Sequence, residues 1–237
     1  MLYFKGCTGR EKLRNIPDSV EKLLNMMCID YYTLDNEGCC GSFLLRTGFE
    51  EDAKNVMKKN LDEFKNQKIL TSCAGCYKTL KEDYKKYFKT DLDVVHISQL
   101  LRDLINESEL KENKELSKYG ITVTYHDPCH LGRHSGEYDA PREIIRNFAN
   151  LKEMENIREN SICCGSGGGV KSAYPEISKE IAINRVKEAE DIGAELILTS
   201  CPFCKLNLSE NSSIEVLDIS EFILNCINNK EENWEGN

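Results

Sequence analysis

Ten of the twelve cysteines in this 237-residue chain fall into a pattern that occurs twice. Each copy has one cysteine, then an adjacent pair followed by glycine, then two cysteines separated by two residues. The first set is Cys7, Cys39, Cys40, Cys73 and Cys76, and the second set is Cys129, Cys163, Cys164, Cys201 and Cys204. Cysteine thiolates bind zinc and iron strongly, so two recurring sets of five predict metal or redox chemistry.

Several kinds of cysteine chemistry can be compared with this pattern. A disulfide framework is disfavoured by the adjacent pairs and by a length that can bury a core without cross-links. A structural zinc ion takes four ligands, and an adjacent pair would crowd it unless one pair stays unliganded. A thioredoxin-like CxxC would use only two thiols of each set. A polynuclear iron–sulfur centre accepts neighbouring thiolates on different irons, although the ferredoxin spacing CxxCxxC is absent, so the pattern favours such a centre.

The repeat extends beyond the cysteines. Residues 69–73 (ILTSC) recur unchanged at 197–201, and residues 93–98 resemble 215–220. The spacing agrees as well, because Cys7 to Cys39 is 32 positions and Cys129 to Cys163 is 34. Two homologous lobes are the simplest explanation.

Short apolar runs of strand length precede the cysteine groups, at residues 2–4, 31–34, 68–70 and 94–97. Residues 42–64 and 173–192 are charged segments with apolar residues at helical spacing. This alternation predicts an α/β fold in which each lobe has a mostly parallel sheet with flanking helices. The cysteines would then lie on loops at the carboxyl ends of the strands. We expect a first domain at 1–106, a connector at 107–120, a second domain at 121–228 and a flexible tail at 229–237.

Composition excludes several classes of protein. With 31 basic and 40 acidic residues, the formal net charge is -9, which disfavours nucleic-acid binding. We expect no membrane insertion, because no apolar run approaches the roughly 18 residues that a spanning helix needs. The first ten residues have no basic segment followed by an apolar stretch, so neither a secretory signal nor a lipid-modified Cys7 is expected. These features predict a protein of the reducing cytoplasm.

The sequence resembles the tandem CCG-domain (cysteine-rich domain) family over nearly the whole chain. Within that family it resembles the catalytic part of CoB-CoM heterodisulfide reductase, which is either the B-type subunit or the C-terminal half of the D-type subunit. Related halves occur in the B-type subunit of thiol:fumarate reductase and in iron–sulfur subunits that oxidise glycolate, lactate or glycerol-3-phosphate. The motifs that carry the resemblance are Cys7, Glu37-Gly38-Cys39-Cys40-Gly41, Cys73-Ala74-Gly75-Cys76, His126-Asp127-Pro128-Cys129-His130, Ile162-Cys163-Cys164-Gly165-Ser166-Gly167-Gly168-Gly169 and Cys201-Pro202-Phe203-Cys204.

The resemblance implies that each set of five cysteines holds one noncubane [4Fe-4S] cluster. In the family, the two clusters face each other and a substrate disulfide is cleaved between them. Because this sequence has no ferredoxin motif and no dinucleotide fingerprint, we also predict a partner subunit with cubane clusters, which a flavoprotein could accompany.

Three of the four histidines, His126, His130 and His134, flank Cys129. A histidine here could protonate a released thiolate, with His130 as the candidate, or it could hydrogen-bond the backbone or a cluster sulfur. The glycines from Gly165 to Gly169 lack the lysine of a phosphate-binding loop, so we expect close backbone approach to a cluster instead.

Coenzymes M and B are anionic, so their binding would need local cations in an acidic protein. The candidates near cysteine motifs are Arg10, Arg46, Arg133 and Lys171, each of which could equally be ordinary surface charge. Cys28 and Cys226 lie outside the repeat in apolar stretches, and we expect both to be buried as small hydrophobic residues.

The leading hypothesis is therefore an iron–sulfur oxidoreductase subunit, resembling heterodisulfide reductase, that acts on a low-molecular-weight disulfide. One alternative is an electron-transfer iron–sulfur subunit of a flavin-linked hydroxy-acid or glycerol-3-phosphate dehydrogenase. The other alternative is a zinc-stabilised interaction module.

Overall fold

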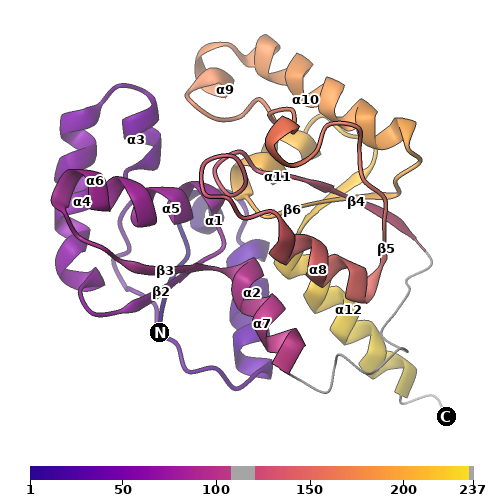
Figure 1. The fold of residues 1–237 in the computed structure, drawn as a ribbon, viewed down its shortest axis with the longest axis horizontal. Helices are drawn as coiled ribbons and strands as arrows, with labels where there is room; N and C mark the ends of the chain where they lie inside the picture. The colour runs from indigo at the N-terminus through magenta and orange to yellow at the C-terminus, as the bar shows by residue number, and fades with distance from the viewer. Residues whose placement is uncertain (108–120, 235–237) are drawn as a thin grey trace.

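A computed structural model describes residues 1–107 and 121–234, and it shows two lobes side by side (Figure 1). The first lobe holds a parallel three-stranded sheet in the order β1 (Leu2–Phe4), β2 (Lys68–Thr71), β3 (Asp93–His96). The second holds a parallel four-stranded sheet in the order β5 (Asn150–Leu151), β4 (Thr122–His126), β6 (Leu196–Thr199), β7 (Glu215–Asp218). The α/β fold with two parallel-sheet lobes is confirmed.

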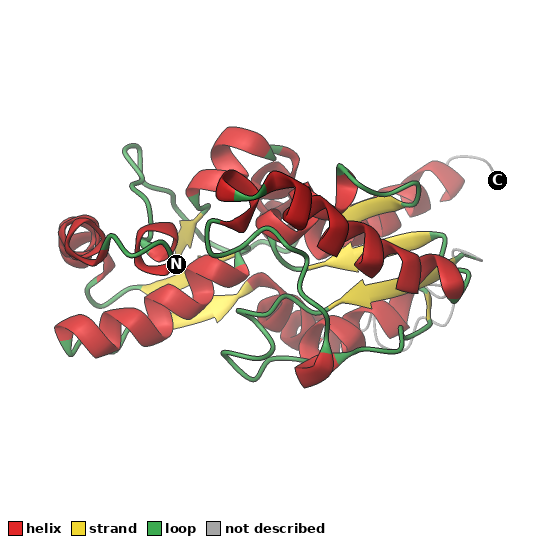
Figure 2. Ribbon diagram, turned by 90° about the horizontal axis from the view of Figure 1, so that it is seen from above, coloured by secondary structure: helices red, strands yellow, loops and turns green. Residues whose placement is uncertain are grey.

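Helices connect the strands and cover the sheets, as Figure 2 shows from above. The first lobe contains α1 (Cys7–Lys12), α2 (Asn15–Met26), α3 (Ser42–Arg46), α4 (Glu50–Phe64), α5 (Ala74–Lys78), a π-helical turn at Thr79–Asp83, α6 (Tyr84–Phe88) and α7 (Ile97–Glu107). The second contains α8 (Asp139–Phe148), a short 3-10 turn at Arg158–Asn160, α9 (Val170–Ala173), α10 (Pro175–Asp191), α11 (Pro202–Ser209) and α12 (Ile219–Trp234).

A shared hydrophobic core joins the lobes. Helices α2 and α7 of the first lobe pack against α12 and α8 of the second, respectively. One face of each sheet packs on this helical layer, with Leu70 from β2 and Leu198 from β6 in the same buried cluster. The lobes are therefore held in a fixed relation by buried apolar surface, which is the main stabilising contribution in such a fold.

Three expected elements differ in detail from the structure. Residues 31–34 form only an isolated bridge between Tyr32 and Leu2, in the position that β5 occupies in the second lobe. The helix expected at 42–64 is divided into α3 and α4, because Gly48 between them has a φ of 89°. The helix expected at 173–192 is divided at Tyr174, because Pro175 has no amide hydrogen and begins a new helix.

The two cysteines outside the repeat behave differently from each other. Cys226 is buried in α12, as expected. The prediction for Cys28 is wrong, because its side chain is exposed. Helix α2 ends at Met26, and Cys28 follows with a φ of 54° in the turn that leads the chain away from the helix.

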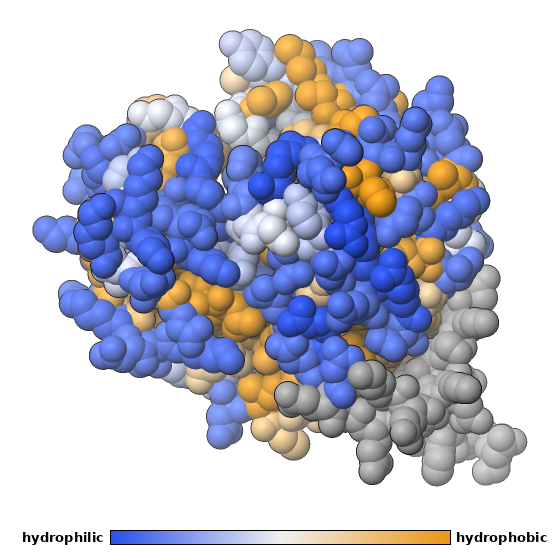
Figure 3. Space-filling view, in the orientation of Figure 1, coloured by the Kyte–Doolittle hydropathy of each residue, from blue (hydrophilic) through white to orange (hydrophobic). Residues whose placement is uncertain are grey.

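The ends of the expected domains lie partly outside the described residues. Residues 108–120, most of the expected connector, and residues 235–237 are not described. Helix α12 continues to Trp234 and so includes the first part of the segment that we expected as a flexible tail. Among the described residues, no helix combines the length and the apolar character that crossing a membrane requires. Figure 3 shows a largely hydrophilic face with hydrophobic residues in separate patches.

Corresponding strands of the two lobes end in different buried titratable residues, His96 in β3 and Asp218 in β7. Each accepts a hydrogen bond from the amide of the serine two residues later, at 3.2 Å for His96 Nδ1 and 3.0 Å for Asp218 Oδ1. Asp218 Oδ2 has no hydrogen-bond partner in the described part of the chain. Burial lowers the pKa of His96 to about 4 and raises the pKa of Asp218 to about 7.

These pKa shifts predict opposite effects of pH on stability. Asp218 stays protonated in the folded protein up to about pH 7 but ionises near pH 3.8 in the unfolded chain. Its contribution to the free energy of unfolding therefore falls as pH rises from about 4 to about 7. The contribution of His96 is instead lost as pH falls from 6.5 to about 4. We expect Asp218→Asn to match the wild type near pH 4 and to exceed it at pH 8. The difference should grow by up to about 1.4 kcal/mol per pH unit.

Anaerobic urea unfolding at several pH values measures this difference. Glu215→Gln, at the exposed start of the same strand, is the matched control and should show little pH-dependent change. A stability difference between Asp218→Asn and the wild type that stays constant from pH 4 to pH 8 would contradict the assignment.

Candidate iron–sulfur site

All ten cysteines of the repeat line one cavity between the lobes. The parallel strands explain this, because Cys7 follows β1 and Cys73 follows β2, while Cys129 and Cys201 follow β4 and β6. The cysteine loops therefore leave the carboxyl edge of each sheet, where ligand sites of α/β folds usually lie. Other residues that line the cavity include Thr8, Phe43, Arg46, Gly75, Pro128, His130 and Phe203.

The thiols within each set contact one another in the same order. In the first set the contacts run from Cys7 to Cys39, Cys40, Cys76 and Cys73, and in the second from Cys129 to Cys163, Cys164, Cys204 and Cys201. The sulfur atoms of Cys76 and Cys40 are 3.3 Å apart. Cys73 also contacts Cys201, which links the two sets across the lobe boundary. The repeated sequence pattern thus corresponds to a repeated arrangement of the sulfur atoms.

Hydrogen bonds among the thiols shift their pKa values in opposite directions. Thiols of Cys129 and Cys164 donate to Cys163 and lower the pKa of Cys163 well below its usual range. The contact with Cys163, followed by burial, raises the pKa of Cys129. In the first set Cys40 is the thiol with the lowered pKa, because Cys39 and Cys76 donate to it. Each set therefore presents at least one thiol poised to be a thiolate, the form that binds metals.

Buried carboxylates tie the loop of each single cysteine to the loop of the adjacent pair. In the first lobe, Glu37 accepts hydrogen bonds from the amides of Lys5 and Gly6, both at 2.8 Å. In the second lobe, Asp127 accepts one from the amide of Arg158 at 2.8 Å. Glu37 lies in the loop of the adjacent pair, whereas Asp127 lies in the loop of the single cysteine. In both lobes, however, the carboxylate joins the same two loops.

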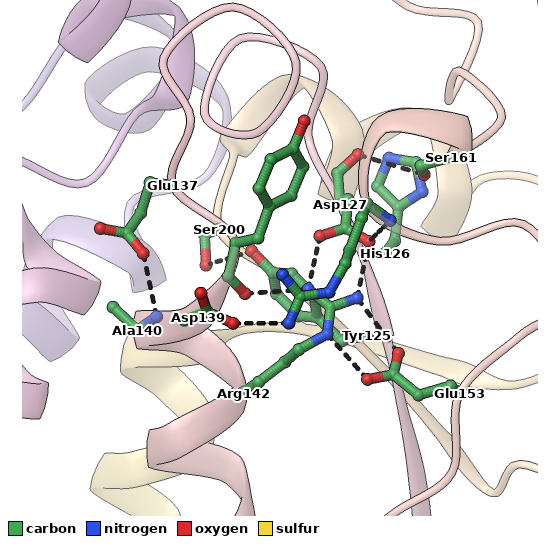
Figure 4. A network of polar contacts seen from close by, with 12 residues as sticks. Tyr125, His126, Asp127, Glu137, Asp139, Ala140, Arg142, Glu153, Ser161 and Ser200 are labelled. Carbon is green, nitrogen blue, oxygen red and sulfur yellow. Dashed lines mark hydrogen bonds and ion pairs between the residues drawn. The ribbon is translucent and has the colours of Figure 1, made fainter.

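Asp127 is held in turn by the fully buried Arg142, as Figure 4 shows. The Arg142 guanidinium donates to both oxygens of Asp127, at 2.7 and 2.8 Å, and to Glu153 at 2.7 Å. Breaking a buried pair of this kind leaves an uncompensated charge and typically costs about 3–5 kcal/mol. The arginine thus fixes the strand end that precedes Cys129.

The glycine after each adjacent pair has two structural roles. Gly41 and Gly165 have φ values of 92° and 84°, which favour glycine. Their amides lie 3.4 Å from the sulfurs of Cys39 and Cys163, to which they donate. A side chain at Gly165 would place its Cβ 2.6 Å from the carbonyl oxygen of Ser178 in α10. The backbone at Gly165 thus lies close to cysteine sulfur, and its approach to a cluster stays a prediction.

The histidines near Cys129 occupy different environments. His126 ends β4 and is buried, and burial together with the Arg185 charge lowers its pKa to about 3. His130 lines the cavity, with its Nδ1 3.7 Å from where a Cβ on Gly75 of the first lobe would lie. Burial also lowers the pKa of His130. The ring of His134 lies beside that of His130, with centroids 5.3 Å apart and an interplanar angle of 44°.

Only one of the four candidate cations lines the cavity. Arg46 does so, and it pairs with Asp83 at 2.6 Å. Arg10 and Arg133 instead donate to backbone carbonyls of the loops before the cysteine pairs, at Glu37 and at Glu159 and Ser161. Lys171 is engaged by Asn207 and Glu210. Arg10 and Arg133 are therefore structural.

Several site residues were missed in the sequence. Lys78 pairs with the second oxygen of Asp83 at 2.6 Å and adds positive charge beside Arg46. Asn60 and Asn207 donate to the carbonyls of Cys39 and Cys164, at 2.8 and 2.6 Å. None of these belongs to a motif, and a polar residue at a buried position of an amphipathic helix is the one signal that could have indicated the asparagines.

The donor set fits an iron–sulfur group better than a single ion. Sulfur predominates, the thiols contact each other within two sets of five, and backbone amides point at sulfur, as is typical of iron–sulfur sites. His126, Cys164 and Cys204 have ligand atoms within 4.8 Å of one another, which a zinc ion could also use. That smaller group would leave the other cysteines of the set without a role.

Comparison with known proteins agrees with these motifs. The family described as "Cysteine-rich domain" (CCG) matches residues 1–81 and 123–209. The chain is 39% identical over 235 residues to the D-type subunit of dihydromethanophenazine:CoB–CoM heterodisulfide reductase from Methanosarcina acetivorans, covering 92% of the chain and 57% of the relative. It is 31% identical to the B-type subunit of fumarate reductase (CoM/CoB) from Methanothermobacter marburgensis, covering 93% of the chain and 45% of the relative. It is 30% identical to EtfAB:quinone oxidoreductase of Syntrophomonas wolfei, covering 94% of the chain and 34% of the relative. The chain thus spans less than two thirds of the length of these relatives.

The glycine geometry predicts different tolerance at two nearby positions. Gly165→Ala combines an unfavourable φ with a backbone clash, so we expect the free energy of unfolding to fall by about 2–3 kcal/mol. Gly167→Ala, where a Cβ would have nothing within 4 Å, is the matched control and should change it by less than about 0.5 kcal/mol. Denaturant unfolding measures both. Equal stability of the two variants would show that the clash at Gly165 is relieved at little cost.

Proposed function

Because this chain belongs to the cysteine-rich CCG-domain family, we propose that it is an iron–sulfur oxidoreductase subunit that cleaves a low-molecular-weight disulfide of the CoM-S-S-CoB type. The observation that carries the proposal is the convergence of two complete sets of five thiols on one cavity. A single electron-transfer centre would need one set, whereas a disulfide takes up two electrons and two protons to give two thiols. Two facing sites suit that stoichiometry.

Each set would hold one noncubane [4Fe-4S] cluster. Cys7, Cys39, Cys40, Cys73 and Cys76 would bind the first, and Cys129, Cys163, Cys164, Cys201 and Cys204 the second. When bound, the clusters would supply electrons one at a time. The chain contributes sulfur ligands, amide donors to sulfur and a cavity wall in which Phe43, Pro128 and Phe203 limit access of water.

Arg46 is suited to orient an anionic substrate. It is the one charged side chain among the described residues that line the cavity. Lys78 shares its partner Asp83, so two cations face a single carboxylate and positive charge remains. A sulfonate, carboxylate or phosphate group of a disulfide would bind beside Arg46 with the apolar chain along Phe43.

His130 is suited to deliver a proton to a thiolate product. It comes from the Cys129 loop of the second lobe yet lies over Gly75, between two cysteines of the first set. Burial favours the neutral ring, and the charge of Cys201 acts in the opposite direction. The ring would therefore gain a proton as negative charge collects in the cavity and pass it to sulfur.

The electrons would come from cubane clusters outside these 237 residues, which contain neither a ferredoxin motif nor a dinucleotide fingerprint, and we propose a partner subunit as their carrier. The heterodisulfide and fumarate reductase relatives are named as subunits, which supports an assembly with a partner. A reducing cytoplasm would keep the thiols free for cluster binding.

A second candidate function is electron relay without a bound disulfide. The similarity to EtfAB:quinone oxidoreductase favours it, since that name describes transfer between a flavoprotein and a quinone. In this case the clusters would exchange electrons with partners, and the cavity would bind no thiol.

Metal analysis and ligand addition test the proposal. After anaerobic purification or reconstitution, we expect about four irons and four sulfides per lobe and no stoichiometric zinc. Coenzyme M added to the oxidised protein should produce a new paramagnetic signal. Cys204→Ser should lose iron from one lobe, whereas Cys28→Ser, at an exposed cysteine outside the repeat, should not.

The outcomes separate the alternatives. One zinc per lobe without sulfide would contradict the proposal and support an interaction module. Full iron loading with no response to either coenzyme, and no disulfide reduction with a chemical electron donor, would favour the relay.

The role of His130 has its own test. His130→Gln should retain iron but reduce the rate of disulfide reduction by about 100-fold or more, because a positioned proton donor is lost. His134→Gln, whose parent residue lies next to His130 but does not line the cavity, is the matched control. A rate in His130→Gln within about twofold of the wild type, with the same pH profile, would rule out proton donation by His130.

A further inference from the structure

The two lobes differ at the end of the strand that leads to the first cysteine of each set. Phe4 lies three residues before Cys7, and His126 lies three residues before Cys129. Both are the last residues of their strands, and both are buried. The first lobe thus places a hydrocarbon ring where the second places an imidazole.

The helix that covers this position differs in the same way. Buried residues of α4 lie at positions 53, 57, 60 and 64, and those of α10 include 178, 182, 185 and 189, so Arg185 corresponds to Asn60. Arg185 donates from Nε to His126 Nδ1 at 3.1 Å. Asn60 donates to Tyr84 and to the carbonyl of Cys39, while Phe4 packs edge-to-face on Phe64 with centroids 5.6 Å apart. The first lobe therefore has no corresponding polar pair.

Arg185 sets the tautomer of His126. A guanidinium only donates hydrogen bonds, so Nδ1 is the acceptor and the ring proton is on Nε2. Arg185 is itself nearly fully buried and is held by the Asn156 carbonyl at 2.8 Å and by Glu188 at 2.7 Å. The direction of the ring is therefore set by a buried hydrogen bond from Arg185, which two partly buried contacts hold in turn.

The His126 ring lies close to sulfur atoms of the second cysteine set. Nε2 is buried without a hydrogen-bond partner in the described part of the structure. A ring nitrogen of His126 and the sulfurs of Cys164 and Cys204 all lie within 4.8 Å of one another. A buried donor of this kind is costly unless an acceptor is supplied, and thiolate or cluster sulfur is the acceptor at hand.

We propose that His126 is a positioning residue that donates its Nε2–H to sulfur of the second cysteine set and makes the two iron–sulfur sites unequal. This inference rests on the proposed binding of iron–sulfur clusters. An N–H donor stabilises the more negative, reduced state of a cluster, so the second site should have the higher reduction potential. Phe4 offers no such donor to the first site.

Redox titration of the reconstituted, fully iron-loaded protein, followed by electron paramagnetic resonance, tests the proposal. The wild type should show two distinct midpoint potentials. His126→Phe, which copies the first lobe, should shift the higher midpoint downward and leave the lower one unchanged. His126→Gln should stay close to the wild type, because its amide oxygen can accept from Arg185 while its nitrogen donates to sulfur.

Phe4→Leu is the matched control, because it alters the equivalent strand end without adding or removing a donor. It should move neither midpoint. If His126→Phe loses iron, the test rests on His126→Gln. An iron-loaded His126→Gln variant with wild-type midpoints supports donation. The same variant with a lowered upper midpoint overturns it. A single midpoint in the wild type, or midpoints unmoved in iron-loaded His126→Phe, would also overturn it.

These outcomes differ from a failure of the proposed function. If the protein binds no iron and sulfide, the proposed function is wrong, and the basis of this inference is lost with it. Iron-loaded protein that reduces no disulfide removes only the proposed substrate, and the midpoint shift can still be observed. Iron-loaded, active protein with unmoved midpoints removes only the role of His126.

Discussion

Parallel pairing of the strands is the constraint on which the arrangement of sulfur depends. Because β1 and β2 run in one direction, and β4 and β6 do likewise, the loops that follow them leave a single edge of each sheet. Helices α2, α7, α8 and α12 pack between the lobes, so that both edges open on one cavity. Sliding a strand by one residue would turn its side chains to the other face, so Leu70 and Leu198 in the shared core also help to set the sulfur positions.

Strand pairing alone leaves loops free to move, and buried polar contacts remove that freedom. Glu37 in one lobe and Asp127 in the other join the corresponding cysteine loops through backbone amides. Arg142 carries this restraint from Asp127 into α8 and to Glu153. These groups are desolvated, so each depends on its partners for a favourable free energy. These contacts hold the cysteine loops in place, and restraints of this kind are how a protein orients ligands and tunes a metal centre.

The cysteines of the two lobes are arranged alike, but several residues around them differ between the lobes. Phe4 corresponds to His126, Thr8 to His130, and His96 to Asp218. The second lobe contributes His130 to the cavity and His126 beside its cysteines, whereas Arg46 comes from the first lobe. In the proposed reaction this difference is useful, because the two halves of a mixed disulfide differ in charge and leave as different thiols.

The cysteine sets, the two-lobed α/β fold and the family could be predicted from the sequence, because cysteine spacing and strand periodicity are local properties of the chain. The contacts of the polar residues near the cysteines could not be predicted in this way, because they depend on the folded arrangement. Arg10 and Arg46 both follow cysteine motifs, yet one binds a backbone carbonyl and the other lines the cavity. The apolar stretch around Cys28 gave no sign that α2 ends before it and leaves it exposed. The pairing of Arg185 with His126 joins residues 59 positions apart, and the fate of a polar group depends on which partners folding brings within reach.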